Sequence, residues 1–120
     1  MKEFVMSKDS HIVSTPKGKL RGFRFDGVDH FYGIRYAKAK RFQMPEPVPT
    51  GEVLIPHRFW PSSEHCQYLN LWTKSCEPGA KRPVLFWIHG GGYASGSGME
   101  QICYDGFNLA KDDDVVVVTV

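Results

Sequence analysis

Cysteine is scarce in this sequence, and the cysteines present lack the spacing of a disulfide or metal framework. Only Cys66, Cys76 and Cys103 occur in 120 residues, and no two of them form a CxxC pair. An odd number of cysteines without such a pair argues against a full set of disulfides and against a zinc site. We therefore expect reduced thiols and no bound metal ion.

Long apolar segments are also lacking. No run approaches the roughly 20 residues that a helix needs to span a bilayer. The N-terminal stretch from Met1 to Asp9 lacks the apolar centre of a secretion signal. These absences predict a cytoplasmic protein without a membrane partner.

An excess of charge of one sign is missing as well. The 15 basic and 13 acidic residues leave a formal net charge of +2, and the basic residues are scattered from Lys2 to Lys111. A nucleic-acid-binding surface needs a concentrated basic patch, so we expect no nucleic-acid partner. The content of 42% hydrophobic and 13% aromatic residues is that of a folded domain.

The most informative stretch that is present runs from Val84 to Tyr93. Five apolar residues, Val84 to Ile88, are followed at once by His89 and by glycines 90–92. A short apolar run bounded by glycines is typical of a strand buried on both faces, so we expect residues 82–89 to form the central buried strand. Because glycine has no Cβ, successive N–H groups can turn toward one point and bind an anion or an oxyanion.

The remaining patterns predict an α/β fold that begins with antiparallel strands. Residues 12–36 alternate short β-type runs with turn signals, which predicts a three-stranded antiparallel meander with a bulge or bend at Gly22. Five prolines between residues 42 and 61 favour an extended connection. Further along, the patterns predict strands at 69–73 and 115–120, loops at 75–83 and 94–98, and a short helix within 104–111.

The chain stops inside the apolar run 115–120, where a complete domain would leave an uncapped, adhesive strand. We therefore expect residues 1–120 to be the incomplete N-terminal portion of a single larger domain. Three aromatic residues, Trp72, Phe86 and Trp87, are expected in its core.

A glycine cluster after a strand also suggests a phosphate-binding loop, but the spacing argues against one. A GxGxxG motif starting at Gly90 needs glycine where Ser95 stands, and one starting at Gly96 needs glycine where Gln101 stands. No Gly-Lys pair follows the cluster, so a GxxxxGK motif fails too. The sequence therefore does not predict nucleotide binding.

Four motifs in order along the chain resemble type-B carboxylesterases, the α/β-hydrolase family that includes the cholinesterases. The His-Gly-Gly-Gly-Tyr run at 89–93 resembles the oxyanion-hole loop of the fold. Residues 63–72, Ser-Glu-His-Cys-Gln-Tyr-Leu-Asn-Leu-Trp, resemble the family signature Ser-Glu-Asp-Cys-Leu-Tyr-Leu-Asn-(Ile/Val)-Trp. Residues 18–22 and 32–37 resemble its first hairpin and its Gly-Ile-Pro-Tyr-Ala segment. The resemblance implies the N-terminal part of an α/β-hydrolase fold, with an antiparallel leading edge followed by central strands of a mixed sheet.

Some positions depart from the family pattern. His65, Gln67 and Arg35 stand where the family usually has Asp, Leu and Pro. Cys66 matches a cysteine that pairs with an earlier one in secreted members, but no cysteine precedes it here, which agrees with a cytoplasmic member. The connection between residues 49 and 62 is also shorter than is usual in the family.

The resemblance implies acyl transfer from a small-molecule carboxylic ester to water, without a cofactor. By analogy with the family, the backbone N–H groups of Gly91 and Gly92 stabilise the oxyanion, and a third donor follows the nucleophile. A side chain at either glycine would crowd that space. His89 and Gly90 would support the loop, His89 through a hydrogen bond. Tyr93 would either line the substrate pocket or pack against neighbouring residues.

The nucleophile itself is not among these residues. Neither Ser95 nor Ser97 lies in a GxSxG motif, since Tyr93 stands two positions before the first and Met99 two positions after the second. In this fold the serine, the acid and the histidine all follow the oxyanion strand. We therefore expect the full-length protein to be a carboxylesterase and residues 1–120 alone to be inactive.

Two alternatives stay open from the sequence. The chain could belong to a non-catalytic binding module of the same fold, as in the cholinesterase-like adhesion proteins, or it could be a truncated product without function. In either case the glycine run would be a structural turn.

Overall fold

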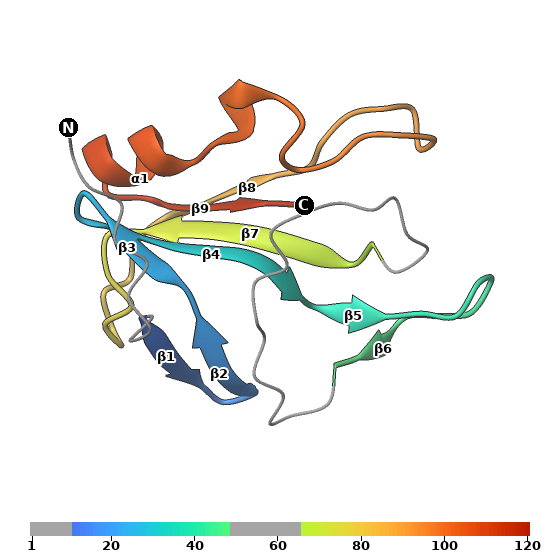
Figure 1. Ribbon diagram of the computed structural model, residues 1–120, viewed down its shortest axis with the longest axis horizontal. Coiled ribbons are helices and arrows are strands. Elements are labelled where there is room, and N and C mark those ends of the chain that lie inside the picture. The colour runs from blue at the N-terminus through green and yellow to red at the C-terminus, as the bar shows by residue number, and fades with distance from the viewer. Residues whose placement is uncertain (1–10, 49–65) are drawn as a thin grey trace.

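The computed structural model describes residues 11–48 and 66–120. Within these ranges the chain forms a five-stranded mixed sheet, two small two-stranded sheets and a short helix packed on the main sheet (Figure 1). The strands of the main sheet lie in the order β3-β4-β7-β9-β8, so its middle combines segments that are far apart in the sequence.

The segment at 12–36 forms four strands in two sheets. β1 (Ile12–Thr15) pairs antiparallel with β2 (Gly18–Arg21) in a sheet of their own. β3 (Phe23–Phe25) and β4 (Val28–Arg35) form the next antiparallel hairpin, which belongs to the main sheet. The predicted antiparallel pairing is confirmed, but the prediction of one three-stranded meander is wrong.

Gly22 lies where the chain passes from one sheet to the other, and this explains the difference. Its N–H donates to the carbonyl oxygen of His11 at 2.8 Å. A Cβ at this position would collide with the carbonyl oxygen of His30 and would lie 2.6 Å from the ring of Phe31. Only glycine allows β4 to pass so close to this backbone. The bend predicted at Gly22 is confirmed, and it is sharp enough to end one sheet and begin another.

A second short hairpin follows β4. β5 (Ala37–Lys38) pairs antiparallel with β6 (Glu46–Pro47), which lies inside the proline-rich connection. The part of that connection from residue 49 onward lies outside the described residues, as do residues 63–65 of the predicted family signature.

β7 (Tyr68–Thr73) is the middle strand of the main sheet. It pairs antiparallel with β4 on one side and with β9 (Val116–Thr119) on the other. β8 (Val84–Trp87) then pairs in parallel with β9. The predicted strands at 69–73 and 115–120 are confirmed, and so is a mixed sheet that begins with antiparallel strands.

A helix covers one face of this sheet. A 3-10 helix, η1 (Ile102–Tyr104), leads to α1 (Phe107–Asp112), which packs on β7 and β9 as Figure 1 shows. The helix predicted within 104–111 is confirmed, with its end one residue later. The buried core beneath it consists of Val28, Trp72, Ala110 and Val117. No helix in the described part of the chain is long and apolar enough to cross a membrane.

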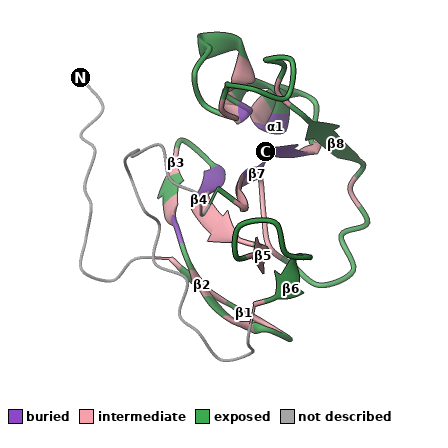
Figure 2. Cartoon of the chain, turned by 90° about the vertical axis from the view of Figure 1, so that its right-hand side faces the viewer, coloured by how far each residue is buried: buried purple, intermediate pink, exposed green. Residues whose placement is uncertain are grey.

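β8 is an edge strand among the described residues, which corrects the prediction of a central buried strand. All four of its residues are exposed (Figure 2), and Phe86 and Trp87 leave 55% and 44% of their surface accessible. The prediction of Phe86 and Trp87 as core residues is therefore wrong here, whereas Trp72 is buried as predicted. A parallel strand is central only when a further strand lies beside it, and no described residue forms one on the outer side of β8.

Candidate functional site: the glycine loop after β8

The glycine loop, residues 89–98, follows β8 at the carboxyl end of the parallel pair β8 and β9. Open α/β sheets bind their ligands at this end of the strands. Two hydrogen bonds beyond the strands fix the base of the loop. The N–H of Val120 donates to the carbonyl oxygen of Trp87 at 3.0 Å, and the N–H of His89 donates to that of Val120 at 3.3 Å. The three glycines therefore begin directly beyond the carboxyl ends of β8 and β9.

A tight turn shapes the loop. Gly91 and Gly92 have φ angles of +131° and +62°, and Tyr93 follows with +61°. The carbonyl oxygen of Gly91 accepts hydrogen bonds from the N–H groups of Ala94 at 3.1 Å and Ser95 at 3.3 Å. A Cβ on Gly91 would collide with the carbonyl oxygen of Ser95. Position 91 therefore requires glycine on both conformational and steric grounds.

The other two glycines occupy open space. A Cβ at Gly90 or Gly92 would meet no described atom within 4 Å. The left-handed backbone at Gly92 nevertheless strains any residue with a side chain. Within the described residues, a side chain at position 91 would clash with Ser95, and one at position 92 would strain the backbone. A side chain at position 90 would do neither.

The backbone N–H groups of Gly91 and Gly92 are unpaired within the described residues. Neither donates a hydrogen bond to any group in 11–48 or 66–120, and both glycines are exposed. Adjacent free donors at the end of a strand are suited to a carbonyl oxygen that gains negative charge.

His89 lies against its own loop. Its Nδ1 is 2.6 Å from the carbonyl oxygen of Gly90, and because a carbonyl can only accept, Nδ1 carries the proton. The same ring touches Gly96, where φ is +119° and a Cβ would lie 2.5 Å from Nδ1. The structure places His89 inside the loop, and its supporting role remains a prediction.

Tyr93 projects away from the described residues. Its side chain is fully exposed, so packing within the described part of the chain is excluded as its role. The role as a substrate-pocket residue remains a prediction.

Sequence reasoning missed the residues that hold the far end of the glycine loop. Gly98 lies against β9, where a Cβ would be 3.1 Å from Thr119 Oγ1. Asn70 Nδ2 donates to the same Oγ1 at 3.2 Å, and Asn70 Oδ1 accepts a hydrogen bond from the N–H of Gly33 at 3.0 Å. Asn70 thereby links β4, β7 and β9 beside the loop. A polar residue in the middle of an otherwise apolar strand is the signal that could have found it.

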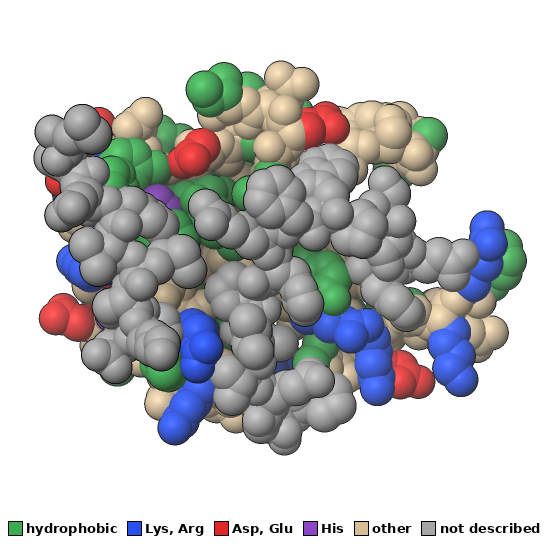
Figure 3. All heavy atoms as spheres, in the orientation of Figure 1, with side chains coloured by type: hydrophobic (Ala, Val, Ile, Leu, Met, Phe, Trp, Pro, Cys, Tyr) green, Lys and Arg blue, Asp and Glu red, His purple; other side chains and the backbone are tan. Residues whose placement is uncertain are grey.

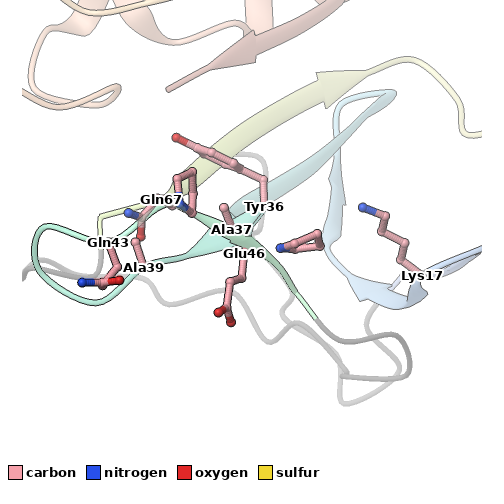
Figure 4. A pocket seen from close by; sticks show the side chains of 9 residues that line it. Lys17, Tyr36, Ala37, Ala39, Gln43, Glu46 and Gln67 are labelled. Carbon is pink, nitrogen blue, oxygen red and sulfur yellow. The ribbon is translucent and has the colours of Figure 1, made fainter.

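An open pocket lies elsewhere on the protein, between the β1–β2 turn and the β5–β6 hairpin. Figure 4 shows Lys17, Tyr36, Gln43 and Glu46 among its lining side chains. No glycine-loop residue lines it. The group of potential metal ligands found among the described residues, His11, Asp29 and Cys76, contains no residue of the loop.

Charged side chains are mixed on the face shown in Figure 3. Lys and Arg lie in separate small groups, with Asp and Glu side chains between or beside them. The described side chains visible on this face form no continuous basic patch.

The antiparallel strands before the parallel pair β8 and β9 agree with the N-terminal part of an α/β-hydrolase fold, and the solved structures that superpose on the chain have this fold. An esterase of Clostridium hathewayi that hydrolyses aliphatic aromatic polyesters superposes with a TM-score of 0.80 at 42% identity, over 94% of this chain and 27% of that one. Residues 48–120 match the sequence profile of the carboxylesterase family. The chain belongs to this family, which confirms the predicted fold class and the predicted relationship.

Further relatives agree with this assignment. The para-nitrobenzyl esterase of Bacillus subtilis is 34% identical over 91% of this chain and 27% of its own length. An acetylcholinesterase of Trittame loki is 49% identical over 75% of this chain and 21% of its own length. A carboxylesterase of Geobacillus stearothermophilus gives a TM-score of 0.74 at 45% identity, over 90% of this chain and 25% of that one. The chain thus spans about a quarter of the length of the proteins it matches.

Proposed function

We propose that this chain forms the oxyanion-hole part of a serine hydrolase that cleaves small-molecule carboxylic esters. The observation that carries the proposal is that the N–H groups of Gly91 and Gly92, at the carboxyl end of β8, have no partner among residues 11–48 and 66–120. Membership of the carboxylesterase family supports the reaction class. The para-nitrobenzyl esterase among the relatives supports an ester as the substrate.

The chemistry follows from the loop. When a serine attacks an ester carbonyl, the carbonyl oxygen becomes negatively charged, and donors held ready for it lower the barrier. Gly91 and Gly92 would supply two such donors, while the carbonyl oxygen of Gly91 is held in the turn by Ala94 and Ser95. The serine, the acid and the general base would come from polypeptide beyond these residues, so the chain alone would be inactive. The three unpaired cysteines support a cytoplasmic location for the enzyme.

Substitution of two neighbouring glycines in the full-length protein tests the oxyanion role. Gly91→Ala forces Ser95 to move and displaces the donors, so we expect kcat for a para-nitrophenyl ester to fall by about 100-fold to 1,000-fold. Gly90→Ala is the matched control, because its Cβ meets open space and its backbone is not left-handed. Thermal unfolding of both variants checks that the fold is retained. Equal kcat values for the two variants would remove the glycine pair from the mechanism.

A fluorophosphonate probe separates this proposal from a non-catalytic binding module. The probe modifies the activated serine of a hydrolase, so the full-length protein should be labelled and residues 1–120 alone should not. A full-length protein that folds but resists labelling would favour the binding module.

A further inference from the structure

We propose that His11, Asp29 and Cys76 form a binding site for a zinc ion. One nitrogen, one oxygen and one sulfur ligand atom from these residues all lie within 4.8 Å of one another. The three residues come from different parts of the fold. His11 precedes β1, Asp29 lies in β4 and Cys76 follows β7.

This cluster and the glycine loop lie at opposite ends of the strands in the main sheet. Asp29 pairs with Thr73 at the end of β7, whereas the start of β7 pairs with the end of β9, next to the glycine loop. The zinc site therefore shares no residue with the proposed oxyanion hole, and its test is independent of the esterase activity.

The separations around Asp29 fit tetrahedral coordination. Oδ2 of Asp29 is 3.3 Å from Nε2 of His11 and 3.6 Å from Sγ of Cys76. Zinc ligands at ordinary bond lengths and tetrahedral angles lie about 3.3 Å apart for nitrogen and oxygen, and about 3.5 Å apart for sulfur and oxygen. An ion between the three atoms would thus need little rearrangement around Oδ2.

The three candidate ligand atoms already contact one another around the buried carboxylate of Asp29. The side chain of Asp29 is 1% exposed, and its other oxygen, Oδ1, is bound by Arg24 Nη1 at 2.6 Å. Nε2 of His11 is buried yet makes no hydrogen bond within the described part of the chain. Buried polar atoms in native proteins are nearly always satisfied. A bound cation would give Nε2 a ligand bond and would replace the hydrogen bond that Oδ2 accepts from Cys76 Sγ.

The donor set selects the kind of metal. Imidazole nitrogen and thiolate sulfur favour zinc, whereas calcium and magnesium prefer oxygen ligands alone. Cys76 must lose its proton to coordinate zinc, and that proton passes to solvent without any redox change. The thiolate and the Asp29 carboxylate together offset the charge of the ion next to Arg24. A water molecule can supply the fourth ligand.

Zinc titration of the metal-free full-length protein tests the site. Isothermal titration calorimetry should show one Zn²⁺ per chain, and Co²⁺ should give a thiolate charge-transfer absorption band. Loss of an outer-shell partner typically weakens metal affinity 10-fold to 100-fold, so loss of a direct ligand in Cys76→Ser should weaken it at least about 100-fold. Cys103→Ser, which alters an exposed cysteine, should bind zinc like the parent.

His11→Gln provides a second variant that decides the case if Cys76→Ser does not fold. It should weaken zinc binding to a similar extent and should leave the ester hydrolysis unchanged. A parent protein that binds no stoichiometric zinc would overturn the proposal. So would equal zinc affinity in the parent and in the folded variants of Cys76 and His11.

Discussion

At the scale of single residues, Cys76 has an environment unlike that of the other two cysteines. It is partly buried and lies 3.6 Å from the carboxylate of Asp29. Burial and, to a smaller extent, the negative charge of Asp29 raise the pKa of the Cys76 thiol to about 11. The thiol is therefore protonated at neutral pH in the metal-free protein, while Cys66 and Cys103 are exposed.

This difference predicts a selective pattern of alkylation. Because only the thiolate reacts, iodoacetamide at pH 8 should modify Cys76 much more slowly than Cys66 or Cys103 in the same metal-free molecule. The Cys76 rate should keep rising with pH until about 11. Peptide mass spectrometry after timed quenching measures all three rates together. Equal alkylation rates of the three cysteines at pH 8 would contradict a raised pKa at Cys76.

The same pKa has a consequence for stability. The folded-state value of about 11 lies above the ordinary value of 9.0. Cys76 therefore stabilises the folded state fully below pH 9, and this contribution is lost as the pH rises toward 11.

At the scale of secondary-structure elements, Gly106 sets how closely α1 approaches the sheet. A Cβ at this position would lie 2.6 Å from Val117 Cβ and 2.8 Å from the ring of Trp72. Both neighbours belong to the buried core, so neither can move away easily.

Gly106→Ala should therefore destabilise the protein. Overpacking of this kind costs about 1–3 kcal/mol in the free energy of unfolding. The control is Asn108→Ala, an exposed position on the same helix, which should change the free energy by less than about 0.5 kcal/mol. Urea denaturation followed by tryptophan fluorescence compares the two. A Gly106→Ala variant as stable as Asn108→Ala would show that α1 can shift without cost.

Local patterns in the sequence predict most of these elements but few of their pairings. The apolar runs at β7 and β9 and the helix before β9 follow from residue types alone. The register that joins Asn70 to Thr119 connects residues 49 positions apart, and no local signal encodes it. The apolar run at β8 likewise reveals a strand, but burial depends on neighbours that lie outside the run.

In the candidate sites, too, local patterns predict some residues, and others are found only from the three-dimensional structure. The glycines at 90–92 are predictable because a change from apolar residues to glycine marks the end of a strand. The sequence predicts Gly96 and Gly98 only as loop residues. In the structure, the lack of a side chain lets Gly96 pack against His89 and lets Gly98 pack against β9. The cluster of His11, Asp29 and Cys76 was not predicted, because the pairing of β4 with β7 and the hydrogen bond between Gly22 and His11 assemble it from distant positions.

At the scale of the whole molecule, the edge strand β8 and the residue after it carry exposed apolar side chains. Val84, Phe86 and Ile88 leave 62%, 55% and 71% of their surface accessible. An exposed apolar edge strand is a template for association between chains, because its backbone groups and side chains both lack partners.

Residues 1–120 expressed alone should therefore self-associate through β8. Analytical ultracentrifugation should show a concentration-dependent increase in mass, and the double substitution Phe86→Lys with Ile88→Lys should reduce it. Ile102→Lys is the matched control, since Ile102 is 95% exposed but lies outside the strand. A monomer at all concentrations, or equal association in all three proteins, would contradict this prediction.

The strand order also has a consequence for synthesis on the ribosome. The partner of β8 is β9, and Thr119 follows Trp87 by 32 positions. Synthesis adds about 5–20 residues per second, so roughly two to six seconds pass between the synthesis of β8 and that of β9. During this interval Val120 is not yet present to anchor His89, so the glycine loop forms late. The exposed apolar strand β8 is therefore synthesised before Val120, the residue whose hydrogen bonds hold the start of the glycine loop.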